Sequence, residues 1–265
     1  MTESNIFFRS LHLGVEDNGE TSVIGNNFKL DYVDMTVYDE KRKVLKELFE
    51  KHIRVKCKAK ERSGALNIFT IDDEGNVERV NEFRGVKFFQ KPGLTNTFVT
   101  HKENLYSNAK IVYNNSNNFC YISKSKYLIN GLMADFGGMS LLSIGSDFSC
   151  GPTEIRLREH FDVHIGNDCM FSSQITLWTS DGHAIFNKDG EVINRGGDII
   201  IGNHVWVGHA VKILKSSMIN DDSVIGSSSL VNKKFENGNV IIAGFPAKVI
   251  RNEITWNRKP PFAFP

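Results

Sequence analysis

His183 is the residue whose type and setting best suit acid–base chemistry in this chain. It lies in the polar stretch TSDGHAIF, with Asp181 two positions before it. An imidazole titrates near neutral pH, so a histidine held by a rigid scaffold can act as a general base towards a hydroxyl group. A loop histidine alone is a weak signal, because most are simply exposed. The position of His183 makes it a candidate, since it falls in the one large interruption of a sequence repeat.

Trp206 is the second residue in an unusual setting. It directly precedes Val207, at a position where the repeat should face outward and a large aromatic side chain has no core to fill. An exposed indole on a flat face indicates a partner chain or a stacked ligand. A subunit interface alone would also explain it.

A six-residue period positions both side chains. It runs across IGNHVWVGHAVKILKSSMINDDSVIGSSSLV, and its anchors are Ile201, Val207, Ile213, Ile219, Ile225 and Val231. Compact side chains follow four residues after the anchors, at Val205, Val211, Ser217, Ser223 and Ser229. Neither a helix nor an ordinary strand has this period, whereas a hexapeptide repeat does. Three such units complete one triangular coil, and glycines directly after three anchors suit the unusual backbone angles of its turns.

The period also predicts where the prism is interrupted. It is recognisable upstream at Ile165, Phe171 and Leu177, and it resumes at Ile201. Residues 180–198 between them are charged, polar and glycine-rich, so we expect them to leave the prism as a loop. Residues 110–143 are interpreted as irregular opening coils, and the tail from about 245 as a cap on the last coil.

Residues 1–105 lack the period and predict a smaller α+β or mostly β domain, ahead of a β-helix domain at 106–265. Asp39 is a candidate cap of a helix that ends near Ile53. The run IRVKCKAKER alternates apolar and basic residues and predicts a strand. This strand is either a solvated edge or a landing surface for an acidic polymer. Its open face would carry Arg54, Lys56, Lys58 and Lys60. The stretch IDDEGN at 71–76 predicts a hairpin turn.

Composition excludes several function classes. The formal net charge is +1, so no global field favours nucleic acid or a membrane surface. No stretch approaches the ~18 apolar residues that a membrane span needs. The 4 cysteines form no CxxC pair, and Cys150 and Cys169 fall where the repeat wants compact buried residues. These features favour a cytoplasmic protein with free thiols and no metal site.

From about Ile111 to Arg251 the chain resembles the hexapeptide-repeat, left-handed β-helix acyltransferases. More narrowly, it resembles their O-acetyltransferases of galactoside, maltose, sialic-acid and capsular-polysaccharide type. The residues that carry the resemblance are TSDGHAIF, the run IIIGNHVWVG, the spaced Ile-Gly pairs and the closing AGFPAKVIR. The fold expected from it is a left-handed parallel β-helix. The smaller domain predicted at 1–105 has no counterpart in the minimal acetyltransferases, and acceptor recognition or oligomerisation is its expected role.

The resemblance implies an acetyl-CoA-dependent O-acetyltransferase that acts on a saccharide. His183 matches the family's catalytic base, Trp206 matches a tryptophan near the acyl-transfer site, and Asp181 is an orienting or acceptor-contacting residue. The resemblance also implies a homotrimer with active sites shared between subunits. The positions that match coenzyme A contacts are Gly208, His209, Ser227, Lys233, Lys248 and Arg251.

Three alternatives remain open on the sequence. The same base can activate an amine, so N-acylation of an amino sugar, a nucleotide-linked sugar or an antibiotic is one. A non-catalytic β-helix scaffold is another. A zinc protein of the γ-carbonic anhydrase type is the third, since VGHAV at 207–211 resembles that family's first histidine segment. However, Leu214 stands where the paired histidine is needed, so three zinc ligands do not assemble.

Overall fold

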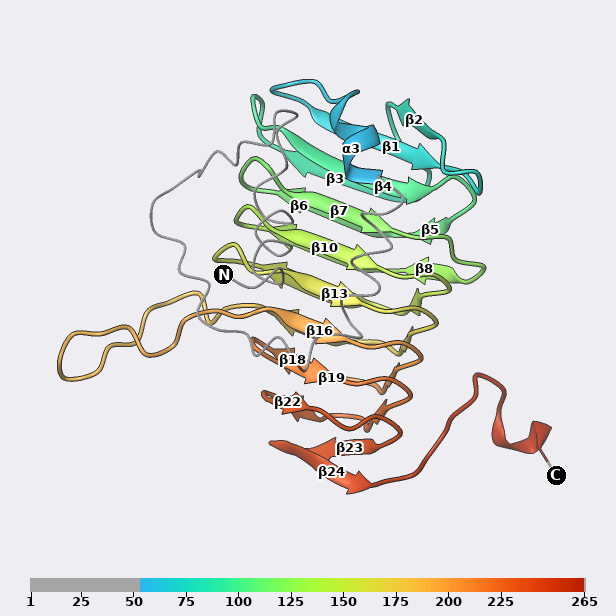
Figure 1. The fold of residues 1–265 in the computed structure, drawn as a ribbon, viewed down its shortest axis with the longest axis vertical. Helices are drawn as coiled ribbons and strands as arrows, with labels where there is room; N and C mark the ends of the chain where they lie inside the picture. Colours follow the sequence, from blue (N-terminus) through green and yellow to red (C-terminus); the bar gives the residue numbers. More distant parts are fainter. Residues whose placement is uncertain (1–52, 265) are drawn as a thin grey trace.

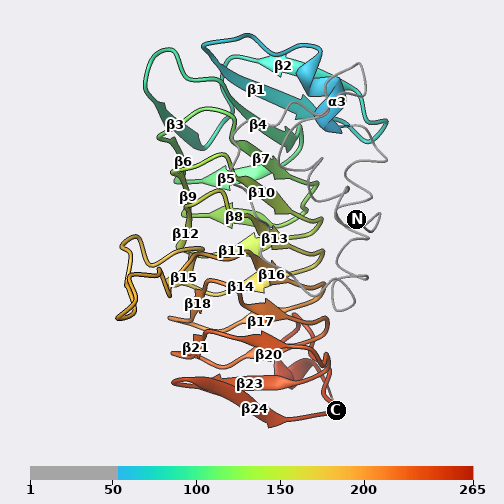
Figure 2. The same cartoon turned by 60° about the vertical axis from the view of Figure 1, so that its left-hand side comes forward.

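A computed structural model of the chain describes residues 53–264, and they form a three-sided parallel β-helix (Figure 1, Figure 2). The nine-stranded sheet holds, in spatial order, β2 (Val77–Val80), β1 (Leu66–Ile71), β4 (Asn96–His101), β7 (Phe119–Ile122), β10 (Leu141–Ile144), β13 (Val163–Ile165), β16 (Ile199–Ile201), β19 (Met218–Ile219) and β22 (Lys234–Phe235). The eight-stranded sheet holds β5 (Leu105–Ser107), β8 (Leu128–Asn130), β11 (Ser149–Cys150), β14 (Met170–Phe171), β17 (Trp206–Val207), β20 (Val224–Ile225), β23 (Ile241–Gly244) and β24 (Ala247–Arg251). The seven-stranded sheet holds β3 (Val86–Gln90), β6 (Ala109–Tyr113), β9 (Leu132–Phe136), β12 (Thr153–Leu157), β15 (Ile175–Trp178), β18 (Lys212–Leu214) and β21 (Leu230–Val231).

The six-residue anchors form the core of the prism, as predicted. All of them are at most 1% exposed, and equivalent anchors of successive coils are paired, as Val207 is with Ile225. The compact residues four positions later are equally buried, from Val205 at 0% to Ser229 at 1%. Burial of a continuous apolar column from coil to coil is the main stabilisation of such a repeat.

Glycine is needed beside the anchors for a different physical reason from the predicted one. Gly208 and Gly226 do not adopt positive φ angles; residues three positions after the anchors do, such as Ala210 at 57° and Ser228 at 58°. A Cβ on Gly208 would lie 2.7 Å from the carbonyl oxygen of Ile225 in the next coil. Close approach of neighbouring coils therefore requires glycine here, and turn angles do not.

The opening coils are regular in register, although the prediction made them irregular. Ile111 pairs with Ala134, 23 residues later, whereas Lys212 pairs with Leu230, 18 residues later. Longer corners in the early coils hide the six-residue period while the strands still stack. The sheets therefore continue upstream of the predicted boundary at 105/106, as far as β1 and β3.

The run that begins at Ile53 is a helix, so the predicted strand is wrong. Helix α3 spans Ile53–Lys58 and buries Ile53 and Cys57, four residues apart, against Phe69 and Val99. An i, i+2, i+4 alternation also places i and i+4 on one helical face, so a short run does not separate the two periods. A helix does not place alternate residues on one face, so Arg54, Lys56, Lys58 and Lys60 do not form the open face that a strand would have given them. Lys56 instead donates a hydrogen bond of 2.7 Å to the carbonyl of Gly75.

Two smaller predictions concern the same region. The hairpin turn at 71–76 is confirmed, since β1 and β2 are antiparallel with Ile71 opposite Val77. The helix predicted from Asp39 lies outside the described residues, apart from its end at Ile53. Cys57, Cys120, Cys150 and Cys169 are free and buried, as the composition suggested. Burial raises the pKa of the Cys57 and Cys150 thiols to about 12.

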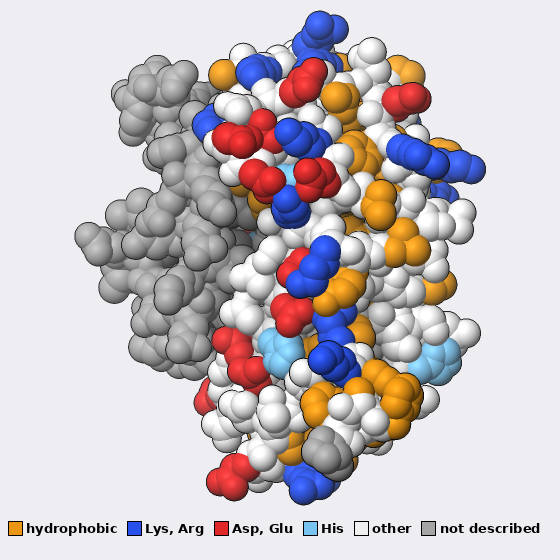
Figure 3. Space-filling model, turned by 90° about the vertical axis from the view of Figure 1, so that its right-hand side faces the viewer, with side chains coloured by type: hydrophobic (Ala, Val, Ile, Leu, Met, Phe, Trp, Pro, Cys, Tyr) orange, Lys and Arg blue, Asp and Glu red, His pale blue; other side chains and the backbone are white. Residues whose placement is uncertain are grey.

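After β24 the chain turns back along the outside of the prism as a strap, residues 252–264 (Figure 1). Strand β24 pairs antiparallel with β23 and closes the eight-stranded sheet. A single-turn 3₁₀ helix at Pro261–Ala263 ends the strap. Between residues 53 and 264, no helix is long and apolar enough to cross a membrane. Cationic and anionic side chains are interspersed on the face in Figure 3, so that face has no large patch of one charge.

Candidate functional site

The predicted loop leaves the prism where β15 ends at Trp178, and it rejoins at β16 (Figure 1, Figure 2). We call this edge, between the seven- and nine-stranded sheets, the loop corner. The outer part of the loop is a hairpin, in which the amide of Ile193 donates to the carbonyl of Ile185 at 2.9 Å and Phe186 bridges to Val192. His183 is exposed and lies between this hairpin and the prism. Its side chain is therefore free to meet an incoming substrate.

Asp181 is held by two neighbours at the base of the loop. Lys215, from the corner after β18, donates to its carboxylate and donates a second hydrogen bond of 2.7 Å to the carbonyl of Asn194. The amide nitrogen of Asn194 lies 2.9 Å from the same carboxylate oxygen. The hydrogen bond from Lys215 lowers the pKa of Asp181, and that from Asn194 adds to the effect. Asp181 therefore holds the base of the loop in place through Asn194 and Lys215.

Glu159, in the coil above, ties the two arms of the loop together on the other side. Its carboxylate accepts a hydrogen bond from the hydroxyl of Ser180 and one of 3.0 Å from the amide of Gly196. The hydroxyl of Ser180 in turn accepts from the amide of Gly182 at 2.9 Å. The arms that lead to and from His183 are thus fixed from the coils above and below.

Trp206 lies on a different side of the prism. It belongs to β17 of the eight-stranded sheet and is 38% exposed, whereas His183 projects from the loop corner. No hydrogen bond or ring contact joins the two side chains within the described chain. The structure therefore does not bring these two predicted site residues together in one chain.

The strap packs beside Trp206. The Trp256 ring lies 6.0 Å from the Trp206 ring and stacks on His204 at 4.2 Å, with 9° between the planes. Its indole nitrogen donates to the carbonyl of His204 at 2.7 Å. His204 also contacts Asp222, with 2.8 Å between Nδ1 and Oδ1. Trp206 is thus flanked by a buried aromatic ring that the C-terminal segment supplies.

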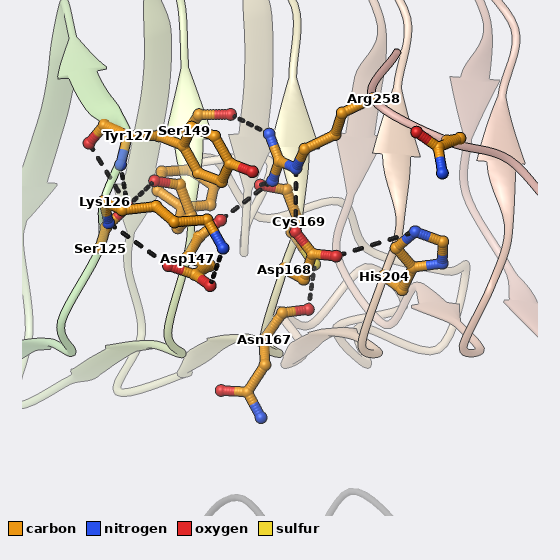
Figure 4. A network of polar contacts seen from close by, with 12 residues as sticks. Ser125, Lys126, Tyr127, Asp147, Ser149, Asn167, Asp168, Cys169, His204 and Arg258 are labelled. Atoms are coloured by element: carbon orange, nitrogen blue, oxygen red, sulfur yellow. Dashed lines mark hydrogen bonds and ion pairs between the residues drawn. The ribbon is translucent and has the colours of Figure 1, made fainter.

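Arg258 fastens the strap to the edge between the nine- and eight-stranded sheets, which we call the strap corner (Figure 4). It donates to the Asp168 carboxylate at 2.9 Å and the Ser149 hydroxyl at 2.8 Å. It also donates to the carbonyls of Asp147 and Cys169, at 2.9 and 3.0 Å. One guanidinium therefore joins two successive coils.

Four of the six predicted cofactor-binding residues share the third edge of the prism, between the eight- and seven-stranded sheets. Gly208 and His209 stack on Ser227 of the next coil: the added Cβ of Gly208 would lie 2.8 Å from the Ser227 amide. Lys248 pairs with Ala243 at the same end of the sheet. We call this edge the ladder corner. His209 and Ser227 are exposed there, and the His209 ring bonds to Ser173 at 2.9 Å.

The other two lie elsewhere. Lys233, between β21 and β22, lies on the loop corner, below His183 and Lys215. Arg251 pairs with Ile241, at the opposite end of β23 from Lys248. The predicted cation cluster is therefore divided among three edges of one prism.

Sequence reasoning missed Asn194, Lys215, Glu159 and Arg258. Asn194 and Lys215 resemble ordinary surface residues in the sequence, because they meet Asp181 only when the corners stack. Glu159 belongs to an earlier coil, 21 residues before Ser180. Arg258 lies in a tail without any repeat, and no sequence signal could have paired it with Asp168.

The parallel β-helix with its extruded loop places this protein in the class of hexapeptide-repeat transferases. No family model matches the chain. It is 30% identical over 197 residues to the polysialic acid O-acetyltransferase of Neisseria meningitidis, covering 66% of this chain and 92% of that one. It is 35% identical over 115 residues to the galactoside O-acetyltransferase of Escherichia coli, covering 42% of this chain and 54% of that one.

The fold is also similar to that of a solved member of this class. The crystal structure of the polySia-specific acetyltransferase NeuO superposes with a TM-score of 0.62 and 26% sequence identity, over 74% of this chain and 90% of NeuO. The chain belongs to the family of hexapeptide-repeat O-acetyltransferases and is an acyltransferase with the left-handed β-helix fold of that family.

Proposed function

We propose that this chain transfers the acetyl group of acetyl-CoA to a hydroxyl of a saccharide, with His183 as the general base. The observation that carries the proposal is the placement of an exposed imidazole on a loop tied to the prism at both arms. The 30% identity to a polysialic acid O-acetyltransferase supports a sialic-acid-type or capsular glycan as the acceptor.

The chemistry needs a base because a sugar hydroxyl is almost wholly protonated at neutral pH. The imidazole of His183 takes the hydroxyl proton while the oxygen attacks the thioester carbonyl. The new C–O bond forms, the C–S bond breaks, and the thiolate leaves and receives the proton from the imidazolium. A positioned base of this kind contributes ~10²–10⁴-fold to the rate, and holding the two substrates together supplies much of the rest.

The ladder corner suits the long arm of coenzyme A. The exposed side chains of His209, Ser227 and Lys248 come from successive coils there, and the Ser227 hydroxyl and the Lys248 ammonium would meet amide and phosphate groups respectively. A homotrimer follows from the same proposal, because a neighbouring copy could bring its Trp206 to the His183 of this chain. Light scattering should then give three times 29.9 kDa; a monomeric mass would contradict the shared site. A cytoplasmic location remains a prediction.

The test is thioester consumption by the His183→Ala variant with a polysialic acid acceptor. We expect kcat to fall by ~10²–10⁴-fold, with the KM for acetyl-CoA within about twofold, because the imidazole acts on the acceptor hydroxyl. Undiminished turnover would remove His183 from the role of base. No turnover by the parent protein with any saccharide would contradict the proposed function as a whole.

A further inference from the structure

We propose that Asn194 is the positioning residue of His183, and that its side-chain amide sets the direction in which the imidazole points. Asn194 lies on the returning arm of the loop, 11 residues after His183 in the sequence. This inference rests on the proposed function of His183 as the base.

The amide group of Asn194 contacts the outgoing arm at three points around His183. Its nitrogen donates to the His183 carbonyl at 2.8 Å and to the Asp181 carboxylate at 2.9 Å. Its oxygen accepts from the amide of Ile185 at 2.7 Å. The residues two before, at and two after 183 are therefore tied to one planar group, which fixes the backbone on both sides of the imidazole.

Asn194 itself is held in place by the prism. Lys215 donates to the carbonyl of Asn194 at 2.7 Å and contacts Asp181 from the corner after β18. Gly197, three residues further on, donates to the carbonyl of Thr179 at 2.9 Å. Asn194 therefore links the backbone around His183 to the rigid coils of the prism.

An orienting group of this kind should matter for the rate and little for binding. The loop projects into solvent, with Phe186 59% and Ile193 61% exposed, so packing does little to hold the backbone near His183. A displacement of about 1 Å at a reacting group costs on the order of 100-fold in rate. Asn194 is held at the loop corner by Lys215, away from the ladder corner assigned to coenzyme A, so acetyl-CoA binding should be unaffected.

The loop also supplies a matched control. Asn187, nearer the tip, makes the same kind of contacts: its side-chain oxygen accepts from the amides of Asp189 and Glu191 at 3.0 and 2.9 Å. It ties the hairpin to itself and does not touch residues 181–185. Asn187→Ala thus removes an asparagine tie from the same loop without loosening the backbone around His183.

The experiment compares Asn194→Ala, Asn187→Ala, His183→Ala and the double variant His183→Ala/Asn194→Ala in thioester-release kinetics. We expect Asn194→Ala to lower kcat by ~10–100-fold, with the KM for acetyl-CoA within about twofold and the thermal midpoint within a few degrees. Asn187→Ala should retain the parent kcat. The double variant should be no slower than His183→Ala alone, because Asn194 acts through the imidazole.

Each contrary result has a distinct meaning. A parent-like kcat for Asn194→Ala beside an inactive His183→Ala would overturn this inference and leave the proposed function intact. An equal loss in Asn187→Ala, or a further loss on adding Asn194→Ala to His183→Ala, would show that the amide acts on loop folding or on substrate, and would also overturn it. Full activity of His183→Ala would reject the proposed base itself.

Discussion

Replacing Arg258 with alanine should release the strap from the prism. The guanidinium makes four hydrogen bonds to two coils (Figure 4) and lies 4.1 Å from the Tyr127 ring centroid in a third. Summing these at full charge-assisted strength would overstate the loss, because Asp168 is 45% exposed and water can replace the guanidinium there. Counting about 1 kcal/mol for each backbone carbonyl and about 1 kcal/mol for the ring gives a net loss of about 3 kcal/mol.

That loss raises the population of the detached strap by roughly 100-fold, since about 1.4 kcal/mol is tenfold in an equilibrium constant. Chymotrypsin cleavage after Trp256, followed by mass spectrometry, reports this population, because the ring is 8% exposed while docked. The matched control is Lys259→Ala, which removes the neighbouring exposed cation and should leave the cleavage rate unchanged. Equal cleavage rates in Arg258→Ala and in the control would show that Arg258 does not hold the strap on the prism.

Two further changes test the coil spacing and the loop. Gly208→Ala places a methyl group 2.7 Å from the Ile225 carbonyl, so the free energy of unfolding should fall by ~1–3 kcal/mol in urea denaturation. The control is Ser227→Ala at an exposed position, which should change the free energy of unfolding by under ~0.5 kcal/mol. Equal stability of the two variants would contradict the close approach of the coils at Gly208. Lys215 lowers the pKa of Asp181, so this contact stabilises the loop fully above the unfolded-state value of ~3.9 and is lost as the pH falls through the lower, folded-state pKa. Lys215→Met should raise that pKa, so carboxyl NMR should show Asp181 titrating at a higher pH; an unchanged titration would exclude Lys215 as the cause.

The repeat pattern alone is enough to predict the prism and the place where it is interrupted. A period of six, carried by Ile201 and the five anchors after it, is compatible with one stacking arrangement, since each anchor must bury against its equivalent in the next coil. The charged stretch after Trp178 has no such anchor and must leave the core. This local chemistry sufficed to single out His183, without any knowledge of its neighbours.

Which side chains contact one another depends on how the coils stack in the folded chain. Lys215 and Asn194 reach Asp181, and Arg258 reaches Asp168 over 90 residues, because the coils bring distant corners to one edge. The same stacking separates Lys233 and Arg251 from Lys248, although the three lie close in the sequence. It also made Ile53–Lys58 a helix, because the i and i+4 positions found a shared apolar surface on the sheet. Contacts between coils depend on the lengths of the corners, and no repeat period encodes those lengths.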